Sequence, residues 1–205
     1  MKKFIFFTVL LGIVIGLLIL AWPFSQHNSE QTTAHLILND KPVGGDFTLQ
    51  SAEGPVSLSD FNDKLVLAYF GYTFCPDICP TNLGNLAVAY RQLMDEEKAK
   101  LQILFISVDP KRDTPERLKQ YADYFDSGII GLTGTKTELD EIANRYGVVY
   151  MIHQDDPKDE HYSVDHSAFT YVIPPGGELA TQLPHATSPD DFVKTIRTYL
   201  NQPQP

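Results

Sequence analysis

The sequence has few of the residues that restrain small proteins covalently or attract nucleic acid. It contains only two cysteines, Cys75 and Cys79, in 205 residues, and its hydrophobic fraction of 43% is enough to build a core without covalent cross-links. It has no internal repeats. Acidic residues outnumber basic ones by 26 to 16, and no basic patch with interleaved aromatic residues is present, so nucleic-acid binding is not expected.

One segment, residues 4–22, is long and apolar enough to cross a membrane. At about 1.5 Å per residue, a helix of this length covers roughly 28 Å, close to the thickness of the hydrocarbon core. The run ends with Leu-Ala-Trp-Pro at residues 20–23, which is a poor cleavage signal and places a tryptophan at the expected membrane interface. We therefore expect residues 1–23 to be an uncleaved membrane anchor, with a removed signal peptide as the alternative.

The charges beside this segment predict its orientation. Lys2 and Lys3 precede the apolar run and should remain in the cytoplasm. Residues 24–34 are polar and predict a tether, and residues 35–205 form the remaining domain. We expect a single-pass protein of the bacterial cytoplasmic membrane, with its domain on the periplasmic side, where disulfides are permitted.

The domain alternates segments typical of strands and helices. Continuous apolar runs such as residues 65–70 predict strands buried on both faces of a parallel sheet. We expect an α/β, thioredoxin-like fold, in which a central mixed sheet is flanked by helices, with an added N-terminal β-hairpin and the N-terminal transmembrane helix. The expected strands cover residues 47–50, 56–58, 65–70, 101–108, 129–132, 148–152, 167–173 and 178–183, and the expected helices cover 80–94, 115–125, 137–146 and 188–200. Residues 154–165 are expected to form a polar loop.

The two cysteines lie between an expected strand and an expected helix, in the sequence GYTFCPDICP at residues 71–80. A disulfide between them would close a loop of about five residues and add little loop entropy, so a chemical role is favoured over a structural one. The positive end of the helix dipole favours the thiolate form. Thiolates bind metals and also attack disulfides, so the cysteines alone leave a disulfide, a metal site or both open.

A histidine stands near the expected strand at residues 167–173. Thiol–disulfide oxidoreductases of the thioredoxin type have two residues between their cysteines and a cis-proline before this strand. Here three residues separate the cysteines, and residues 164–167 contain His166 and no proline. Two sulfurs and one imidazole suit Cu(I) and can accept Cu(II). A structural zinc site would need a fourth ligand, for which His161 and Asp165 are the nearest candidates.

Three motifs together resemble the SCO/SenC family of copper proteins. They are GYTFCPDICP at residues 71–80, SVDPKRDTP at residues 107–115, and DHS at residues 165–167. The match runs in order from about residue 35 to the C-terminus, and the family also has an N-terminal membrane anchor.

This resemblance implies that Cys75, Cys79 and His166 are copper ligands. It also implies a role in assembling the binuclear copper centre of cytochrome c oxidase, by delivering copper, by reducing the cysteines of that centre, or both. The partners would be the copper-centre subunit of the oxidase, another copper chaperone as donor, and a thioredoxin-like reductant. A copper carrier is favoured over an enzyme. The alternatives are a thiol–disulfide reductase that uses Cys75 and Cys79 as its redox-active pair, and a peroxiredoxin-related redox sensor.

Several polar residues near these motifs have expected secondary roles. Asp109, Arg112 and Asp113 are expected to form a salt-bridged structural corner below the site rather than to cap the next helix. Asp165 is a candidate for holding His166 in one tautomer. Asp77 could be a solvated turn residue or could steer a partner. Of the five other histidines, His27 lies in the tether and is expected to be solvated, and the remaining four have no motif support and are expected at the surface: His35, His153, His161 and His185.

Overall fold

The computed structural model describes residues 42–154, 156 and 158–202. The expected membrane anchor and tether, and His35, lie outside these residues. Among the described helices, none is long and apolar enough to cross a membrane.

The centre of the fold is a five-stranded sheet in the order β5–β4–β3–β8–β9. Strand β3 (Leu65–Gly71) is parallel to β4 (Leu101–Ser107) and antiparallel to β8 (Thr170–Ile173). Strand β5 (Ile129–Leu132) extends the parallel side, and β9 (Thr181–Leu183) extends the antiparallel side. All seven residues of β3 are buried, as the continuous apolar run predicted. The predicted α/β fold with a mixed central sheet is confirmed.

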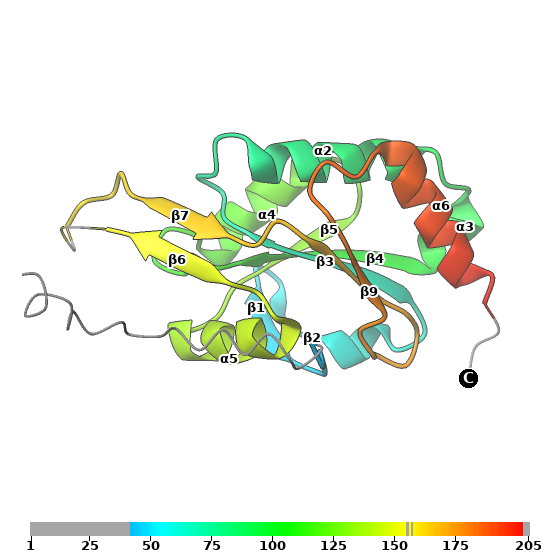
Figure 1. The fold of residues 1–205 in the computed structure, drawn as a ribbon, viewed down its shortest axis with the longest axis horizontal. Coiled ribbons are helices and arrows are strands. Elements are labelled where there is room, and N and C mark those ends of the chain that lie inside the picture. Colours follow the sequence, from blue (N-terminus) through cyan, green and yellow to red (C-terminus); the bar gives the residue numbers. More distant parts are fainter. Residues whose placement is uncertain (1–41, 155, 157, 203–205) are drawn as a thin grey trace, which may run out of the picture. The chain divides into compact units, whose positions relative to one another are not determined.

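Helices cover both faces of this sheet. Figure 1 shows α2 and α6 along one face, and α5 with the hairpin of β1 and β2 on the other. Helix boundaries follow the predicted signals: Thr114 caps α4 and Ser188 caps α6, each followed by proline, and Gly147 ends α5 with a φ of 67°. The bounds are β1 Thr48–Ser51, β2 Gly54–Ser57, the 3-10 helix η2 Leu58–Phe61, α2 Ile78–Arg91, α3 Asp95–Ala99, α4 Pro115–Asp123, α5 Lys136–Tyr146 and α6 Pro189–Leu200.

Aromatic rings fill the space on both sides of β3. Neighbouring residues of a strand point to opposite faces, so Tyr69 and Phe70 pack in different layers. The Tyr69 ring stacks on Phe105 of β4, with 6.3 Å between centroids. The Phe70 ring packs against Tyr171 of β8 at 5.4 Å and against Tyr146 of α5 at 5.9 Å.

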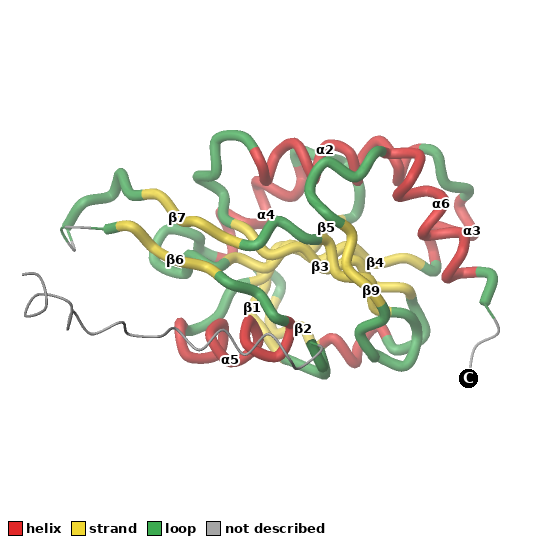
Figure 2. The backbone as a smooth tube through the Cα atoms, viewed as in Figure 1, coloured by secondary structure: helices red, strands yellow, loops and turns green. Residues whose placement is uncertain are grey.

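A second, two-stranded sheet differs from the sequence prediction. Strand β6 (Tyr150–His153) pairs antiparallel with β7 (Ser163–His166), so the end of the expected polar loop is a strand. Among the described residues, β6 and β7 pair with each other and with no strand of the central sheet. Figure 2 shows them as a separate hairpin beyond the central strands. Strand β8 consequently starts at Thr170, three residues later than expected.

Candidate metal centre

The cysteine segment connects the end of β3 to the start of α2. Cys75 lies in the turn, and its N–H donates to the carbonyl of Tyr72 at 3.3 Å. Cys79 lies in the first turn of α2, and its N–H donates to Sγ of Cys75 at 3.4 Å. Gly71 lies directly beneath, because a Cβ at this position would be 2.7 Å from Sγ of Cys79. The absence of a side chain at the end of β3 thus makes room for the inner sulfur.

His166, the last residue of β7, faces this pair. Its Nε2 lies 3.3 Å from Sγ of Cys79, and the donor atoms of Cys75, Cys79 and His166 all lie within 4.8 Å of one another. Its Nδ1 lies 3.2 Å from the carbonyl oxygen of Ser167. A carbonyl can only accept a hydrogen bond, so Nδ1 carries the proton and Nε2 presents its lone pair to the sulfurs.

The two thiols are free and differ in environment. Cys79 is fully buried, whereas Cys75 retains 9% exposure and is the outer thiol. The pKa of Cys75 is lowered, first because the Cys79 side chain hydrogen bonds to it and then because backbone N–H groups, including that of Cys79, do so. The pKa of Cys79 is raised by its hydrogen bond to Cys75 and by burial. Cys75 therefore ionises first.

Comparison with known proteins places this geometry in a family. Residues 37–201 match the SCO1/SenC family. The chain belongs to the SCO1/SenC family.

Relatives of this family include proteins of known structure. The chain is 33% identical over 193 residues to the SCO2-like protein of Rickettsia conorii, covering 92% of this chain and 94% of the relative. It resembles the structure of Bradyrhizobium japonicum ScoI with copper bound, at 33% identity and a TM-score of 0.69, covering 77% of this chain and 99% of ScoI. It also resembles BsSco, described as having a disulfide switch and as a member of the Sco family of cytochrome c oxidase assembly proteins. There the identity is 27% and the TM-score 0.59, over 77% of this chain and 92% of BsSco.

The three donor atoms of this SCO1/SenC chain fit a soft metal ion. Two thiol sulfurs and one imidazole nitrogen form a set that suits Cu(I) and also accepts Cu(II). Cys75, Cys79 and His166 are the only group of this kind that the described residues contain. Neither candidate for a fourth ligand joins it, so the closed four-ligand arrangement of a structural zinc site is not found among the described residues.

The role considered for Asp165 is wrong. Its carboxylate lies 2.7 Å from Nε2 of His153, and its register partner is Met151. Residues 165 and 166 point to opposite faces of β7, so Asp165 cannot orient His166. The main-chain carbonyl of Ser167 takes that role.

The other candidates lie at the surface. His161 has an exposed side chain in the loop before β7, and His185 is exposed in the segment before α6. Asp77 is exposed as the N-cap of α2 and accepts a hydrogen bond from the Thr81 hydroxyl at 3.4 Å. This contact agrees with a local turn role for Asp77.

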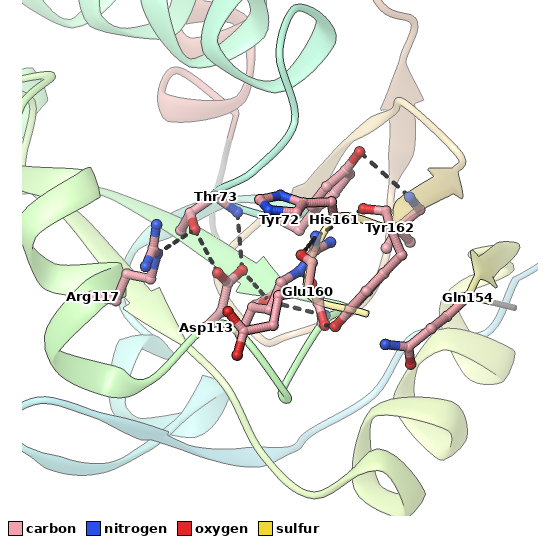
Figure 3. Close-up of polar contacts among 12 residues, drawn as sticks. Tyr72, Thr73, Asp113, Arg117, Gln154, Glu160, His161 and Tyr162 are labelled. Carbon is pink, nitrogen blue, oxygen red and sulfur yellow. Dashed lines mark hydrogen bonds and ion pairs between the residues drawn. The ribbon is translucent and has the colours of Figure 1, made fainter. Parts of the chain in front are cut away.

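The motif at residues 107–115 forms a buried corner between β4 and α4, as expected. Asp113 accepts hydrogen bonds from N–H and Oγ1 of Thr73, at 2.9 and 2.5 Å, and from Oγ of Ser107 at 2.6 Å. Figure 3 shows Thr73 between Asp113 and Arg117. Burial raises the pKa of Asp113. Thr114 caps α4, so Asp113 instead fixes the segment that leads into the cysteines.

Sequence reasoning missed Thr73 and Tyr162 as parts of this corner. Thr73 is two residues before Cys75, and that closeness was the one signal that could have drawn attention to it. Tyr162 stands inside the polar loop as a lone aromatic residue. An aromatic residue in a polar loop was the available sign that this part of the loop packs against the domain. In the structure the Tyr162 side chain is 6% exposed.

Proposed function

We propose that this chain is a copper carrier that binds one copper ion through Cys75, Cys79 and His166. The observation that supports this most strongly is the convergence of two free thiols and an imidazole Nε2 within 4.8 Å. The copper-bound structure of the B. japonicum relative supports the choice of metal. We further propose that the acceptor is the copper-centre subunit of cytochrome c oxidase, in line with the description of BsSco as an oxidase assembly protein.

Transfer would proceed by ligand exchange. Three donor atoms leave a coordination position open, so a thiolate of the acceptor can bind before any ligand of this chain leaves. Cys75 is the partly exposed sulfur and would be the ligand exchanged first, while Cys79 and His166 hold the ion from the inner side. If an oxidant of the periplasm took two electrons from the pair, the Cys75 thiolate and the Cys79 thiol would form a disulfide and release one proton, which would remove two of the three donors. Copper loading would then require reduced thiols.

The location is proposed from the sequence alone. The apolar segment at residues 4–22 would anchor the chain in the bacterial cytoplasmic membrane, with the domain on the periplasmic side. Because thiols oxidise in that compartment, the carrier would depend on a thioredoxin-like reductant. Another copper chaperone would supply the ion.

Copper titration of the reduced full chain in detergent tests the carrier function. We expect one equivalent of copper to bind, and His166→Ala to abolish tight Cu(II) binding. His153→Ala is the matched control, because His153 is an exposed histidine on the same hairpin and should leave binding unchanged. The loaded protein is then mixed with the apo copper domain of the oxidase. Binding without transfer would contradict a carrier and favour a store or sensor.

A thiol–disulfide reductase is the second candidate, and the difference between the two thiols favours it. An outer thiol with a lowered pKa beside a buried thiol is the arrangement of an attacking and a resolving cysteine. In that case His166→Ala should keep most disulfide exchange with oxidised oxidase cysteines while losing copper. A peroxide-handling role requires peroxide turnover by the wild-type protein, and its absence would remove that possibility.

A further inference from the structure

The hairpin that carries His166 needs a support of its own. Strands β6 and β7 share no backbone pairing with the central sheet in the described residues, while the cysteines follow β3 of that sheet, in the turn and at the start of α2. Three residues join β7 to β8, and beyond that link the hairpin is held by side-chain contacts. The His166 ring packs on Tyr69 and Tyr72, and the Val164 N–H donates to the Tyr72 hydroxyl at 3.5 Å. The contacts of the segment that leads into β7 converge on Arg112, in the turn between β4 and α4.

Arg112 is hydrogen-bonded directly to the segment that leads into β7. Its Nη1 donates to the carbonyl oxygens of Tyr162 at 2.8 Å and Glu160 at 3.2 Å. Its guanidinium group lies 3.5 Å from the centroid of the Tyr162 ring, close enough for a strong cation–π contact. Figure 3 shows Glu160, His161 and Tyr162 beside Asp113 and Thr73 of this corner. The planar fork of an arginine can satisfy these contacts together.

Asp109 completes the attachment. One carboxylate oxygen of Asp109 lies 2.5 Å from Nε of Arg112, and the other accepts a hydrogen bond from the Tyr162 hydroxyl at 2.6 Å. The side chains of Arg112 and Asp109 are 7% and 0% exposed, so water competes little for this pair. Tyr162 is thus held at its carbonyl, its ring face and its hydroxyl by two residues of one turn. It lies four residues before His166.

The same turn also holds the cysteine segment. The Arg112 guanidinium lies 4.5 Å from the ring centroid of Phe74, the residue before Cys75. Asp113, the next residue, binds both the N–H and the hydroxyl of Thr73. Asp109, Arg112 and Asp113 of this one turn therefore together contact both segments that carry the donor atoms. They contact none of the three donor residues directly in the described hydrogen bonds.

We propose that Arg112 is a positioning residue that holds the His166 hairpin and the cysteine segment at the separation copper needs. This inference rests on the proposed copper binding and adds to it a residue that acts on His166 through Tyr162, whereas its contact with Phe74 is shared with Arg117. Its loss would release the hairpin and leave a two-sulfur site. Two thiolates still suit Cu(I), whereas Cu(II) binding would lose its imidazole.

The primary test compares Arg112→Met with Arg117→Met in the full-length reduced protein. Arg117 is the matched control, since its guanidinium also packs on Phe74, at 4.1 Å, and its Nε donates to Thr73 at 2.9 Å. It contacts the cysteine side only, in the interactions described. We expect Arg112→Met to lower Cu(II) affinity about 10- to 100-fold, as losses of residues that orient metal ligands do. Arg117→Met should change it by about twofold or less.

A double-mutant cycle separates positioning from general damage. If Arg112 acts through His166, then Arg112→Met should cost no further Cu(II) affinity in a His166→Ala background. Additive losses in the cycle would overturn the proposal. Arg112→Lys should recover only part of the affinity, because lysine cannot reproduce the fork.

Hydrogen exchange gives a readout that does not use copper. Arg112→Met should raise the exchange of the β6 and β7 amides and leave the β3 and β4 amides protected. If the wild type binds no copper, the proposed function fails while this measurement still tests the support of the hairpin. Unchanged β7 exchange would overturn the positioning role.

Tyr162→Phe covers the case in which Arg112→Met does not fold, because it removes only the hydroxyl bond to Asp109. It should raise the exchange of the β7 amides in the same direction and lower Cu(II) affinity less than Arg112→Met. No change in either quantity would contradict the proposal.

Discussion

The two sulfurs and the imidazole of the candidate site stand on supports that differ in construction. The cysteines follow β3, which has all seven residues buried and is hydrogen-bonded on both sides within a five-stranded sheet. His166 is the last residue of β7 in a two-stranded hairpin, and Val164 is the only buried residue of that strand. The first support belongs to the core of the fold, and the second is attached to it by side chains and by the short link from β7 to β8.

This difference separates global stability from local geometry. A change in the central sheet should alter the free energy of unfolding of the whole domain, because its strands unfold together. A change at the hairpin should alter the position of one ligand at little cost to the rest, since locally attached elements open at lower free energy. The following experiments test that distinction, beginning with the largest expected effect.

The same substitution in the two regions tests the comparison directly. Val66→Ala in β3 and Val164→Ala in β7 remove the same two methyl groups from side chains that are 1% and 4% exposed. We expect the first to lower the free energy of unfolding by about 2–4 kcal/mol and the second by about 1 kcal/mol. Chemical denaturation measures both. Equal losses would show that the hairpin is as integrated as the sheet.

Adding a methyl group at the end of β3 should disturb the sulfur side of the site. In Gly71→Ala the new Cβ would lie 2.7 Å from Sγ of Cys79 and 2.9 Å from the Phe105 ring. We expect a loss of about 1–3 kcal/mol in stability from overpacking, together with weaker copper binding. Gly84→Ala in α2 is the control, because its Cβ would meet nothing within 4 Å. It should gain up to about 1 kcal/mol. Tight copper binding by Gly71→Ala would show that the Cys79 sulfur can shift freely.

The two cysteines should differ in their dependence on pH. The lowered pKa of Cys75, about 3, keeps its thiolate populated above that value. Alkylation of Cys75 in the apo protein should therefore change little between about pH 5 and 8, whereas an ordinary thiol reacts roughly tenfold faster per pH unit in this range. Cys79 should react slowly because it is fully buried. Mass spectrometry of the modified peptides at each pH measures both rates. A tenfold rise per pH unit at Cys75 would contradict the assignment.

The smallest effect is expected on the outer face of the hairpin. Asp165→Asn removes the charge that pairs with His153, an exposed contact worth at most about 1 kcal/mol. Copper affinity should stay unchanged, because residue 165 points away from the donor atoms. A tenfold loss measured by copper titration would reinstate Asp165 as a partner of the site.

The sequence predicted the central region better than the hairpin. Strands buried on both faces can be recognised in the sequence as continuous apolar runs. Capping residues such as Thr114 and Gly147 mark where helices begin and end. The short helix α3 at Asp95–Ala99 was not predicted, because its five residues include no buried position that would give a periodic apolar pattern. Strand β7 was likewise assigned to a loop, since only one of its four residues is buried.

Site residues were predictable to different degrees for the same reason. Cys75 and Cys79 are conspicuous as the only cysteines of the chain. Their position after a buried strand predicted that they lie between the end of that strand and the following helix. His166 drew attention by standing where thioredoxin-type enzymes have proline, and only the family resemblance implied that it is a ligand. Arg112 could be placed in a corner, yet its attachment to Tyr162, fifty residues further along the chain, depends on packing that no local pattern encodes.

The contact between Nδ1 of His166 and the carbonyl oxygen of Ser167 also bears on the conditions in which the site can work. A histidine oriented by a carboxylate loses that partner when acidification protonates the carboxylate. A main-chain carbonyl gains no proton over the physiological pH range. Because the carbonyl belongs to the backbone of the next residue, no side-chain substitution can remove it. The direction of the nitrogen lone pair is therefore insulated from the acidity of the medium. Acid should weaken the site only by protonating the three donor atoms themselves.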